Sequence, residues 1–288
     1  MIRKGEDKYK EPLMSLWKRC FPSDTEAFIR FYFEKVYKDS ETLLFINENQ
    51  LVASLQMIPY PVKTGNSIGM AGYIYGAMTH PDFRKRGYME KLLEFSFLEM
   101  KKNAYDYTFL IPQEDWLFGV YEKYGYTKAF PTSKDKTVEA PEQLSCLPRD
   151  KEIRVYKTPA EINLDDAYLV YYRFLTEKQN VILKTKNQFE HILEDLFCEK
   201  GHLLANDRGI AFVVFQREKA ILKEFFYQDE ETKQKFLYTT GKTYPGKEIV
   251  VQNSPGESFS CFKGMIKSLT GNNAPPVTDI YMSMMLDS

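Results

Sequence analysis

The order of hydrophobic patterns in the N-terminal half constrains the fold of this chain most strongly. After two helical patterns, strands are predicted over Leu43–Ile46, Leu51–Tyr60 and Ile68–Met78. The apolar positions then take a helical period from Tyr88 to about Lys102, and a buried strand is predicted over Tyr105–Ile111. Strands and helices in such a mixed order are typical of an α/β layer fold.

The C-terminal half repeats this order in outline. Two helices are predicted first and three strands follow, at Asp165–Glu177, Asn187–Cys198, Leu203–Ala205, Ile210–Gln216 and Ala220–Tyr227. A helix over Glu231–Thr239 and strands over Glu248–Gln252 and Ile280–Leu286 complete the pattern. Because the hairpin that begins at Leu203 resembles the one that begins at Leu43, an internal duplication is a reasonable hypothesis.

Residues 132–152 separate the two halves. They are polar, contain Pro141 and Pro148 and lack a hydrophobic period, which predicts a linker. The predicted domains are therefore residues 1–131 and residues 153–288. A chain of 288 residues is long enough for two domains of ordinary size.

Composition and charge exclude several classes of protein. The 39 basic and 40 acidic residues nearly cancel, so the overall basic charge of a nucleic-acid-binding protein is absent. Hydrophobic residues make up 43% of the chain, which excludes a mostly disordered protein. No apolar run approaches the ~20 residues of a membrane helix, and the N-terminus lacks the apolar segment of a signal peptide. We therefore expect a cytoplasmic protein without a nucleic-acid or membrane partner.

Cysteine and histidine are sparse. The four cysteines are scattered, which favours reduced thiols over a disulfide framework: Cys20, Cys146, Cys198 and Cys261. One cluster has the residue types of a zinc site, namely His191, Cys198 and His202. A helix end with a buried thiol is the simpler interpretation of that cluster, so no metal site is predicted.

A basic segment with a glycine precedes the helix at Tyr88. Arg84, Lys85, Arg86 and Gly87 follow the end of a strand directly. The first N–H groups of a helix are unpaired and its dipole favours negative charge there, so cations are unfavourable at an empty helix start. A solvated charged loop is the ordinary alternative, but the position of the cations favours a bound anion such as pyrophosphate.

Two motifs here resemble those of the GCN5-related N-acetyltransferase (GNAT) superfamily. Arg84-Lys85-Arg86-Gly87-Tyr88-Met89 is similar to the acetyl-CoA loop Arg/Gln-x-x-Gly-x-Gly/Ala, with Met89 in place of the small residue. Tyr121-Glu122-Lys123-Tyr124-Gly125-Tyr126 resembles Tyr-Glu-Lys-x-Gly-Phe and lies on a short helix predicted from Trp116 to Tyr124. The basic triplet and Met89 also resemble the enhanced-intracellular-survival (Eis-like) branch, without its sterol-carrier-like third domain.

The resemblance implies a GNAT fold, in which helices flank a mixed, mostly antiparallel sheet. It further implies a tandem chain with a catalytic first domain and a degenerate second domain. After Phe225-Phe226-Tyr227, the second half has Gln228-Asp229-Glu230-Glu231 where the first half has its basic loop. Acidic residues suit an empty helix start and would repel pyrophosphate. The second domain is therefore expected to bind no CoA.

The activity that the resemblance implies is direct transfer of an acetyl group from acetyl-CoA to a primary amine. The main chain from Arg84 to Met89 would bind pyrophosphate, and that of Ala77, Met78 and Thr79 would pair with the pantetheine arm. Donors near Met78 and Thr79 would also stabilise the oxyanion. Tyr121 would be the general acid that protonates the departing thiolate. Outside the motif, a tyrosine in such a helix is more often a core residue.

The base is not identified by the sequence. Glu114, just before the short helix, is one candidate, and Glu41 or an ordered water is another. The terminal carboxylate of Ser288 is a third, because the chain terminus enters the active site in the longer relatives. The acceptor is expected to be a small-molecule or peptide amine, and a homo-oligomer is left open. The alternative function is a non-catalytic acyl-CoA-binding or regulatory module in which Tyr121 is structural.

Overall fold

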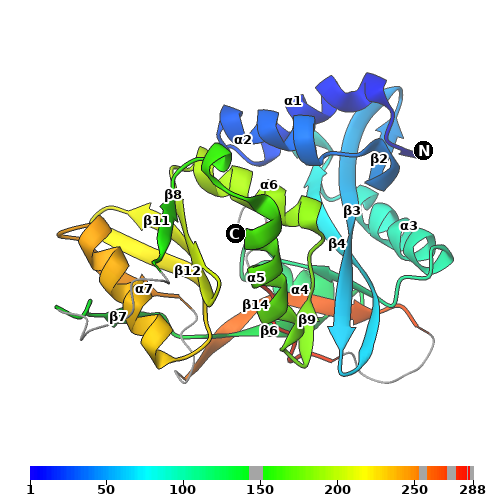
Figure 1. The fold of residues 1–288 in the computed structure, drawn as a ribbon. Coiled ribbons are helices and arrows are strands. Elements are labelled where there is room, and N and C mark those ends of the chain that lie inside the picture. The colour runs from blue at the N-terminus through cyan, green and yellow to red at the C-terminus, as the bar shows by residue number, and fades with distance from the viewer. Residues whose placement is uncertain (143–151, 253–257, 271–276, 284, 286–288) are drawn as a thin grey trace. The chain divides into compact units, whose positions relative to one another are not determined.

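The computed structural model describes residues 1–142, 152–252, 258–270, 277–283 and 285 (Figure 1). The chain divides into two compact units. The first unit comprises Met1–Phe130 and Lys263–Asp279, and the second comprises Pro131–Phe262 and Ile280–Ser288.

The first unit is built on a mixed sheet. Its strand order is β1 (Ile2–Lys4), β2 (Thr42–Asn47), β3 (Gln50–Thr64), β4 (Ser67–Thr79), β5 (Tyr107–Leu110), β14 (Phe259–Ser268) and β6 (Thr127–Ser133). The pairs from β1 to β4 are antiparallel, as is the pair of β5 and β14. Strands β4 and β5 are parallel. This arrangement confirms the predicted α/β class with a mostly antiparallel sheet.

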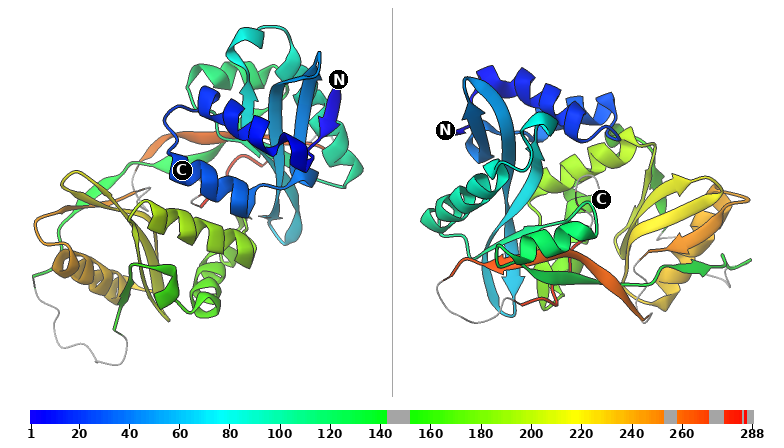
Figure 2. Two further views of the ribbon diagram at one scale, coloured as in Figure 1. Left: turned by 90° about the horizontal axis from the view of Figure 1, so that it is seen from above. Right: turned by 180° about the vertical axis from the view of Figure 1, so that it is seen from behind.

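Helices cover both faces of this sheet. They are α1 (Lys10–Cys20), α2 (Glu26–Phe31), which continues into a π-helical turn (Tyr32–Val36), α3 (Tyr88–Lys102) and α4 (Trp116–Glu122). Leu92 and Leu93 of α3 are buried in one cluster with Ile74, whereas the next strand residue, Tyr75, contacts Trp17 of α1. Because successive strand side chains point to opposite faces, α3 and α1 lie on opposite faces of β4 (Figure 2).

Strand β14 was not predicted from the sequence. It comes from the C-terminal half of the chain and lies between β5 and β6 in the first sheet. A Cβ atom at Gly264 would lie 2.5 Å from the carbonyl oxygen of Leu110, so glycine permits this close pairing. The chain thus returns to the first unit after the expected boundary at residues 132–152. Local patterns carry little information on which distant strand a segment will join.

The second unit repeats the plan of the first. Its strand order is β7 (Lys136–Val138), β13 (Glu248–Val251), β12 (Lys219–Tyr227), β11 (Gly209–Gln216), β10 (His202–Asn206) and β8 (Arg154–Tyr156). Strands β12 and β13 are parallel, as β4 and β5 are in the first unit. The helices are α5 (Leu164–Thr176), α6 (Lys186–Cys198) and α7 (Glu230–Thr243). The order α5, α6, β10, β11, β12, α7, β13 therefore matches α1, α2, β2, β3, β4, α3, β5.

Two further expectations, the linker and the closing strand, also differ from the structure. Strand β7 lies within residues 132–152, which were expected to be a linker, and residues 143–151 of that segment lie outside the described residues. The closing strand expected over Ile280–Leu286 is represented, in the part that the structure describes, by a bridge between Tyr281 and Val181 of β9 (Asn180–Ile182). The pairing of Tyr281 with β9 joins residues about 100 positions apart, and a local sequence pattern does not indicate such a partner.

Candidate active site

A bulge shapes the end of β4. The pairing of β4 with β3 shifts register between Ser54 and Gln56, opposite Gly76. Gly76 has a φ of +54°, and a Cβ atom there would lie 2.8 Å from Cζ3 of Trp17. Glycine accepts positive φ at little cost, and bulges bend a strand and re-aim its side chains. The residues after Gly76 therefore leave the regular course of the sheet.

Replacing Gly76 by alanine is expected to lower the free energy of unfolding by about 2 kcal/mol, because a left-handed backbone costs ~1–2 kcal/mol for an L-residue and the methyl group would displace Trp17. Gly119→Ala is the matched control, since no atom outside its own helix lies within 4 Å of a Cβ at that position in α4. Alanine should stabilise that helix by ~0.5–1 kcal/mol. Urea unfolding of both variants checks this, and a similar loss in both would contradict the role given to Gly76.

The pairing of strands β4 and β5 ends before this bulge. They pair over Ala71–Tyr73 and Tyr107–Phe109, and β4 then continues to Thr79. The His80 N–H points towards β3 and donates to the carbonyl of Val52 at 2.8 Å. Because the main-chain groups of successive residues in a strand point in opposite directions, the N–H and carbonyl of Thr79 point away from β3. The Thr79 carbonyl accepts instead from Nε of Arg84 at 3.3 Å and from Sγ of Cys20 at 3.5 Å.

A cavity of about 420 Å³ lies beside the end of β4. Its walls come from the end of α1, the end of β4, the start of α3 and the segment between β5 and the end of α4. Seven of the predicted site residues line it: Ala77, Met78, Thr79, Arg84, Met89, Glu114 and Tyr121. This volume is within the range of small-ligand sites, which run from ~300 to ~1,000 Å³.

The predicted anion loop reaches α3 in an irregular conformation. Lys85 and Gly87 have φ values of +61° and +75°, and Gly87 precedes α3 without a side-chain cap. The guanidinium of Arg86 lies 5.1 Å from the Phe83 ring centroid and donates to the carbonyl of Asp82 at 3.1 Å. Lys85, Arg86, Gly87 and Tyr88 are not among the residues that line the cavity, so Arg84 and Met89 are the residues of the predicted loop that border it.

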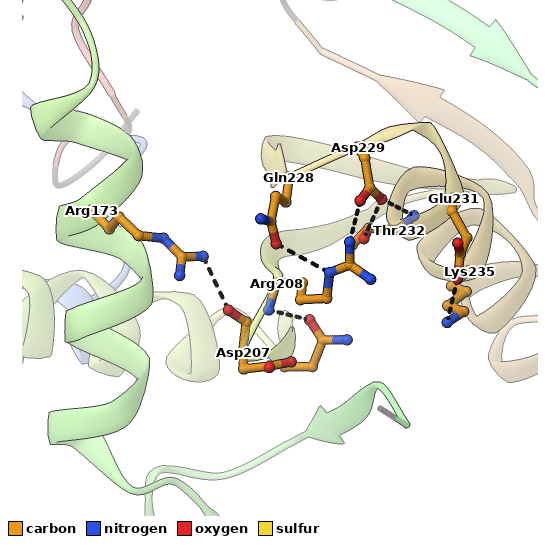
Figure 3. A network of polar contacts seen from close by, with 9 residues as sticks. Arg173, Asp207, Arg208, Gln228, Asp229, Glu231, Thr232 and Lys235 are labelled. Atoms are coloured by element: carbon orange, nitrogen blue, oxygen red, sulfur yellow. Dashed lines mark hydrogen bonds and ion pairs between the residues drawn. The ribbon is translucent and has the colours of Figure 1, made fainter. Parts of the chain in front are cut away.

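The equivalent helix start in the second unit is closed by its own carboxylate. Asp229 caps α7, accepting from the Thr232 N–H at 2.8 Å and its hydroxyl at 2.7 Å, and forms an ion pair with Arg208. Figure 3 shows this network. The hydrogen bonds from Thr232, together with the charge of Arg208, lower the pKa of the Asp229 carboxyl. The two helix starts thus differ in charge and in capping.

Tyr121 is held in place by the end of its own helix. The N–H of Tyr124 donates to the carbonyl of Tyr121 at 2.9 Å, and Gly125 reverses the chain with a φ of +82°. The ring of Tyr126 then packs edge-on against Tyr121, with centroids 5.9 Å apart, and its hydroxyl lies 3.0 Å from Oγ1 of Thr108. The glycine and the final aromatic of the motif therefore position the tyrosine.

The hydroxyl of Tyr121 is available for proton transfer. Burial raises its pKa to about 12, so the phenol keeps its proton at neutral pH. Among the residues that the structure describes, none forms a hydrogen bond with this hydroxyl. A neutral donor thus lies at the wall of the cavity.

The candidate bases lie in different environments. Glu114 is exposed and lines the cavity. Glu41 does not line it and forms an ion pair with Lys38 at 3.0 Å. Ser288 lies outside the described residues.

The cavity is also lined by residues that were not predicted as site residues, among them Cys20 and Trp116. Cys20 ends α1, and burial raises the pKa of its thiol. Trp116 begins α4 and is 66% exposed. Neither residue belongs to a recognisable motif. The chain fold brings Cys20 to the end of β4, and only the three-dimensional structure reveals this.

The described residues contain no group of three or more His, Cys, Asp or Glu side chains that could hold a metal ion. His191 is buried in α6, Cys198 is exposed at the end of α6, and Nδ1 of His202 lies 2.7 Å from the Tyr244 hydroxyl. In the same parts of the chain, no helix combines the length and apolarity needed to cross a bilayer.

Comparison with known proteins relates this chain to acetyltransferases. Residues 1–129 match the family model described as the acetyltransferase (GNAT) domain. A search of curated proteins finds no match to the sequence.

Three solved structures resemble the whole chain. A probable N-acyltransferase from Enterococcus faecalis V583 has a TM-score of 0.75 at 13% identity, covering 93% of this chain and 72% of its own. Eis1 from Mycobacterium abscessus has a TM-score of 0.69 at 10% identity, covering 93% and 74%. A tandem GNAT protein from the clavulanic acid biosynthesis pathway has a TM-score of 0.52 at 9% identity, covering 95% and 100%. At these identities the likeness is one of fold.

Proposed function

We propose that the protein transfers an acetyl group from acetyl-CoA to a primary amine, because residues 1–129 match the acetyltransferase (GNAT) domain and the chain resembles a tandem GNAT protein in fold. One observation carries the proposal. The uncapped, cationic start of α3 adjoins a cavity of about 420 Å³ that is lined by Tyr121. An anion-binding helix start and a neutral proton donor at one cavity are what acetyl-CoA chemistry requires.

The residues around the cavity fit the parts of acetyl-CoA. Arg84 and the main-chain N–H groups from Lys85 to Met89 would bind the pyrophosphate. The main chain at Thr79, which points away from β3, would pair with the pantetheine arm. Met89 lines the cavity where the family has a small residue, so it would pack against the ligand more closely than glycine or alanine.

The chain's own groups would then serve the transfer. Acetyl-CoA supplies an activated thioester carbonyl for attack by the neutral amine. A main-chain N–H near Met78 and Thr79 would donate to the oxyanion that develops on that carbonyl. Tyr121 would donate its proton to the departing sulfur, and Glu114 would accept the proton that the amine loses.

The second unit is proposed to bind no CoA. Asp229 already supplies a carboxylate at the start of α7, where a pyrophosphate would have to bind. A second anion would meet like charge in the same place. The first unit alone would carry the transferase activity.

An assay of CoA thiol release tests the proposal. The full chain is mixed with acetyl-CoA and a panel of amines that includes a polyamine, an aminoglycoside and a lysine peptide. We expect release that depends on at least one amine and exceeds thioester hydrolysis. Saturable acetyl-CoA binding without amine-dependent release would instead support the non-catalytic binding module.

Glu114→Gln is expected to lower kcat/KM near neutral pH by about 10–100-fold, because the attacking amine would lose its proton acceptor. The defect should shrink as the pH rises towards the pKa of the amine. Asp115→Asn is the matched control, since Asp115 is the exposed neighbouring carboxylate and does not line the cavity. Equal activity of Glu114→Gln and the wild type across pH would leave a bound water as the base.

A further inference from the structure

A second cavity lies in the second unit at the equivalent place in the fold. Its volume is about 540 Å³, and its walls come from Arg173 and Phe174 in the last turn of α5, Glu177 and Lys178 just after it, and residues 225–228 at the end of β12. The cavity of the first unit likewise lies between the end of α1 and the end of β4. The duplicated fold thus carries a cavity at the same position in both units.

The walls of the second cavity are aromatic. The rings of Phe174 and Phe226 are stacked with centroids 5.6 Å apart and an angle of 17° between their planes. The neighbouring rings of Phe225 and Tyr227 alternate to the other face of β12, where Phe225 packs against Phe236 of α7. Flat apolar walls of this kind favour a planar ligand, because stacked rings attract one another beyond the area they bury.

Two cations line the same cavity. Arg173 donates one N–H to the carbonyl of Asp207 at 3.0 Å, as Figure 3 shows, which leaves further guanidinium donors for a ligand. Nζ of Lys178 lies 4.2 Å from the Tyr281 ring centroid and 5.6 Å from that of Phe226. No carboxylate of the residues that the structure describes lies within 4 Å of this ammonium. Its close contacts are therefore rings, and the carboxylates of Glu224 and Glu177 act on it from further away.

Burial and nearby charges act in opposite directions on the pKa of Lys178. Burial lowers the pKa of this lysine, and the carboxylates of Glu224 and Glu177 partly oppose that shift. A half-buried ammonium without an ion pair would gain from a carboxylate placed between it and Arg173. A pyrophosphate is a poor candidate, because Asp229 caps the adjoining helix.

We propose that this cavity binds a small aromatic carboxylate, with its ring against Phe174 and Phe226 and its carboxylate paired with Arg173 and Lys178. The site is separate from the proposed acetyl-transfer site, since every wall residue belongs to the second unit. The planar wall favours an aromatic ring, and the two cations, which outnumber the single wall carboxylate of Glu177, favour an acid over an amine or a neutral amide.

Calorimetric titration of the full chain with benzoate tests the site. We expect saturable binding with a Kd of about 1 mM or tighter. Benzamide, which lacks the charge, and cyclohexanecarboxylate, which lacks the planar ring, should each bind about tenfold more weakly. No saturable binding of benzoate, or binding of either analogue as tight as that of benzoate, would overturn the proposal.

Variants locate the binding. Arg173→Gln and Lys178→Met should each weaken benzoate binding about tenfold, since each removes a charge-assisted contact. They should leave acetyl-CoA binding unchanged. Arg154→Gln is the matched control, because Arg154 is an exposed arginine of the second unit that does not line this cavity. Loss of benzoate binding in Gly87→Glu, or an equal loss in Arg154→Gln, would place the ligand elsewhere and refute the site.

Discussion

Replacing Gly87 by glutamate is expected to weaken acetyl-CoA binding by about 100-fold, which corresponds to ~2.7 kcal/mol. The new carboxylate would lie at the start of α3, where the helix dipole and Arg84 otherwise favour an anion. Gly87 has a φ of +75°, so any side chain also strains the backbone there. The measurement is calorimetric titration of each variant with acetyl-CoA.

Matched variants separate charge from strain. Gly87→Ala introduces the same backbone cost without charge, and the nearest atom to its Cβ is Oε2 of Glu90 at 3.6 Å. We expect it to lose much less affinity than Gly87→Glu. Arg84→Glu should cause a similarly large loss of acetyl-CoA affinity without straining the backbone. Lys101→Glu is the control at the other end of α3. It should change the affinity by less than about twofold, because residue 101 is too far from the anion site for its charge to act there. Wild-type affinity in Arg84→Glu would refute the placement of the pyrophosphate.

The contrast between α3 and α7 gives this prediction its basis. The two helices follow equivalent strands in a duplicated fold, yet one begins without a cap beside three cations and the other is capped by Asp229. The net charge of −1 conceals this difference, since charge balance is a property of the whole chain. Local charge at equivalent positions therefore distinguishes the units better than overall composition does.

The sequence predicted correctly those elements whose formation depends on interactions between residues close together in the chain. The helix predicted from Tyr88 to about Lys102 is α3, with these bounds, because its apolar face repeats with the helical period. The role of Gly125 also follows from local geometry, since a helix that ends near Glu122 needs a left-handed residue to reverse the chain. Such features depend on residues close together in the sequence.

Features set by distant contacts were missed. Strand β14 joins the first sheet because it pairs with β5, and a segment around Gly264 carries no local mark of that partner. At the bulge, Gly76 leaves room for the ring of Trp17 from α1, a contact between residues far apart in the sequence. Cys20 likewise reaches the cavity through packing of the end of α1 beside the end of β4, which are far apart in the sequence. The acidic loop at Asp229 was recognised from its charge, but its capping geometry required the structure.

Tyr121→Phe is expected to reduce kcat by about 100-fold while the KM for acetyl-CoA changes by less than about twofold. The variant keeps the ring and its packing on Tyr126 and removes only the proton donor. The measurement is steady-state kinetics with the amine that gives the fastest CoA release. Tyr105→Phe is the matched control, since burial also raises the pKa of Tyr105 but its side chain does not line the cavity.

The pH dependence distinguishes a proton donor from a packing residue. The pKa of Tyr121 is raised to about 12, so its acid form persists through neutral and mildly alkaline pH. For a general acid, activity falls only as the pH rises through the pKa, so no descending limb from Tyr121 is expected between about pH 7 and 10. Burial also raises the pKa of the nearby Cys20 thiol, which indicates that a sulfur anion in this cavity is a stronger base than in water. The same desolvation therefore raises the basicity of both the tyrosine's phenolate and the departing thiolate. Unchanged kcat in Tyr121→Phe across this range would assign the tyrosine a structural role and leave the thiolate to be protonated by solvent.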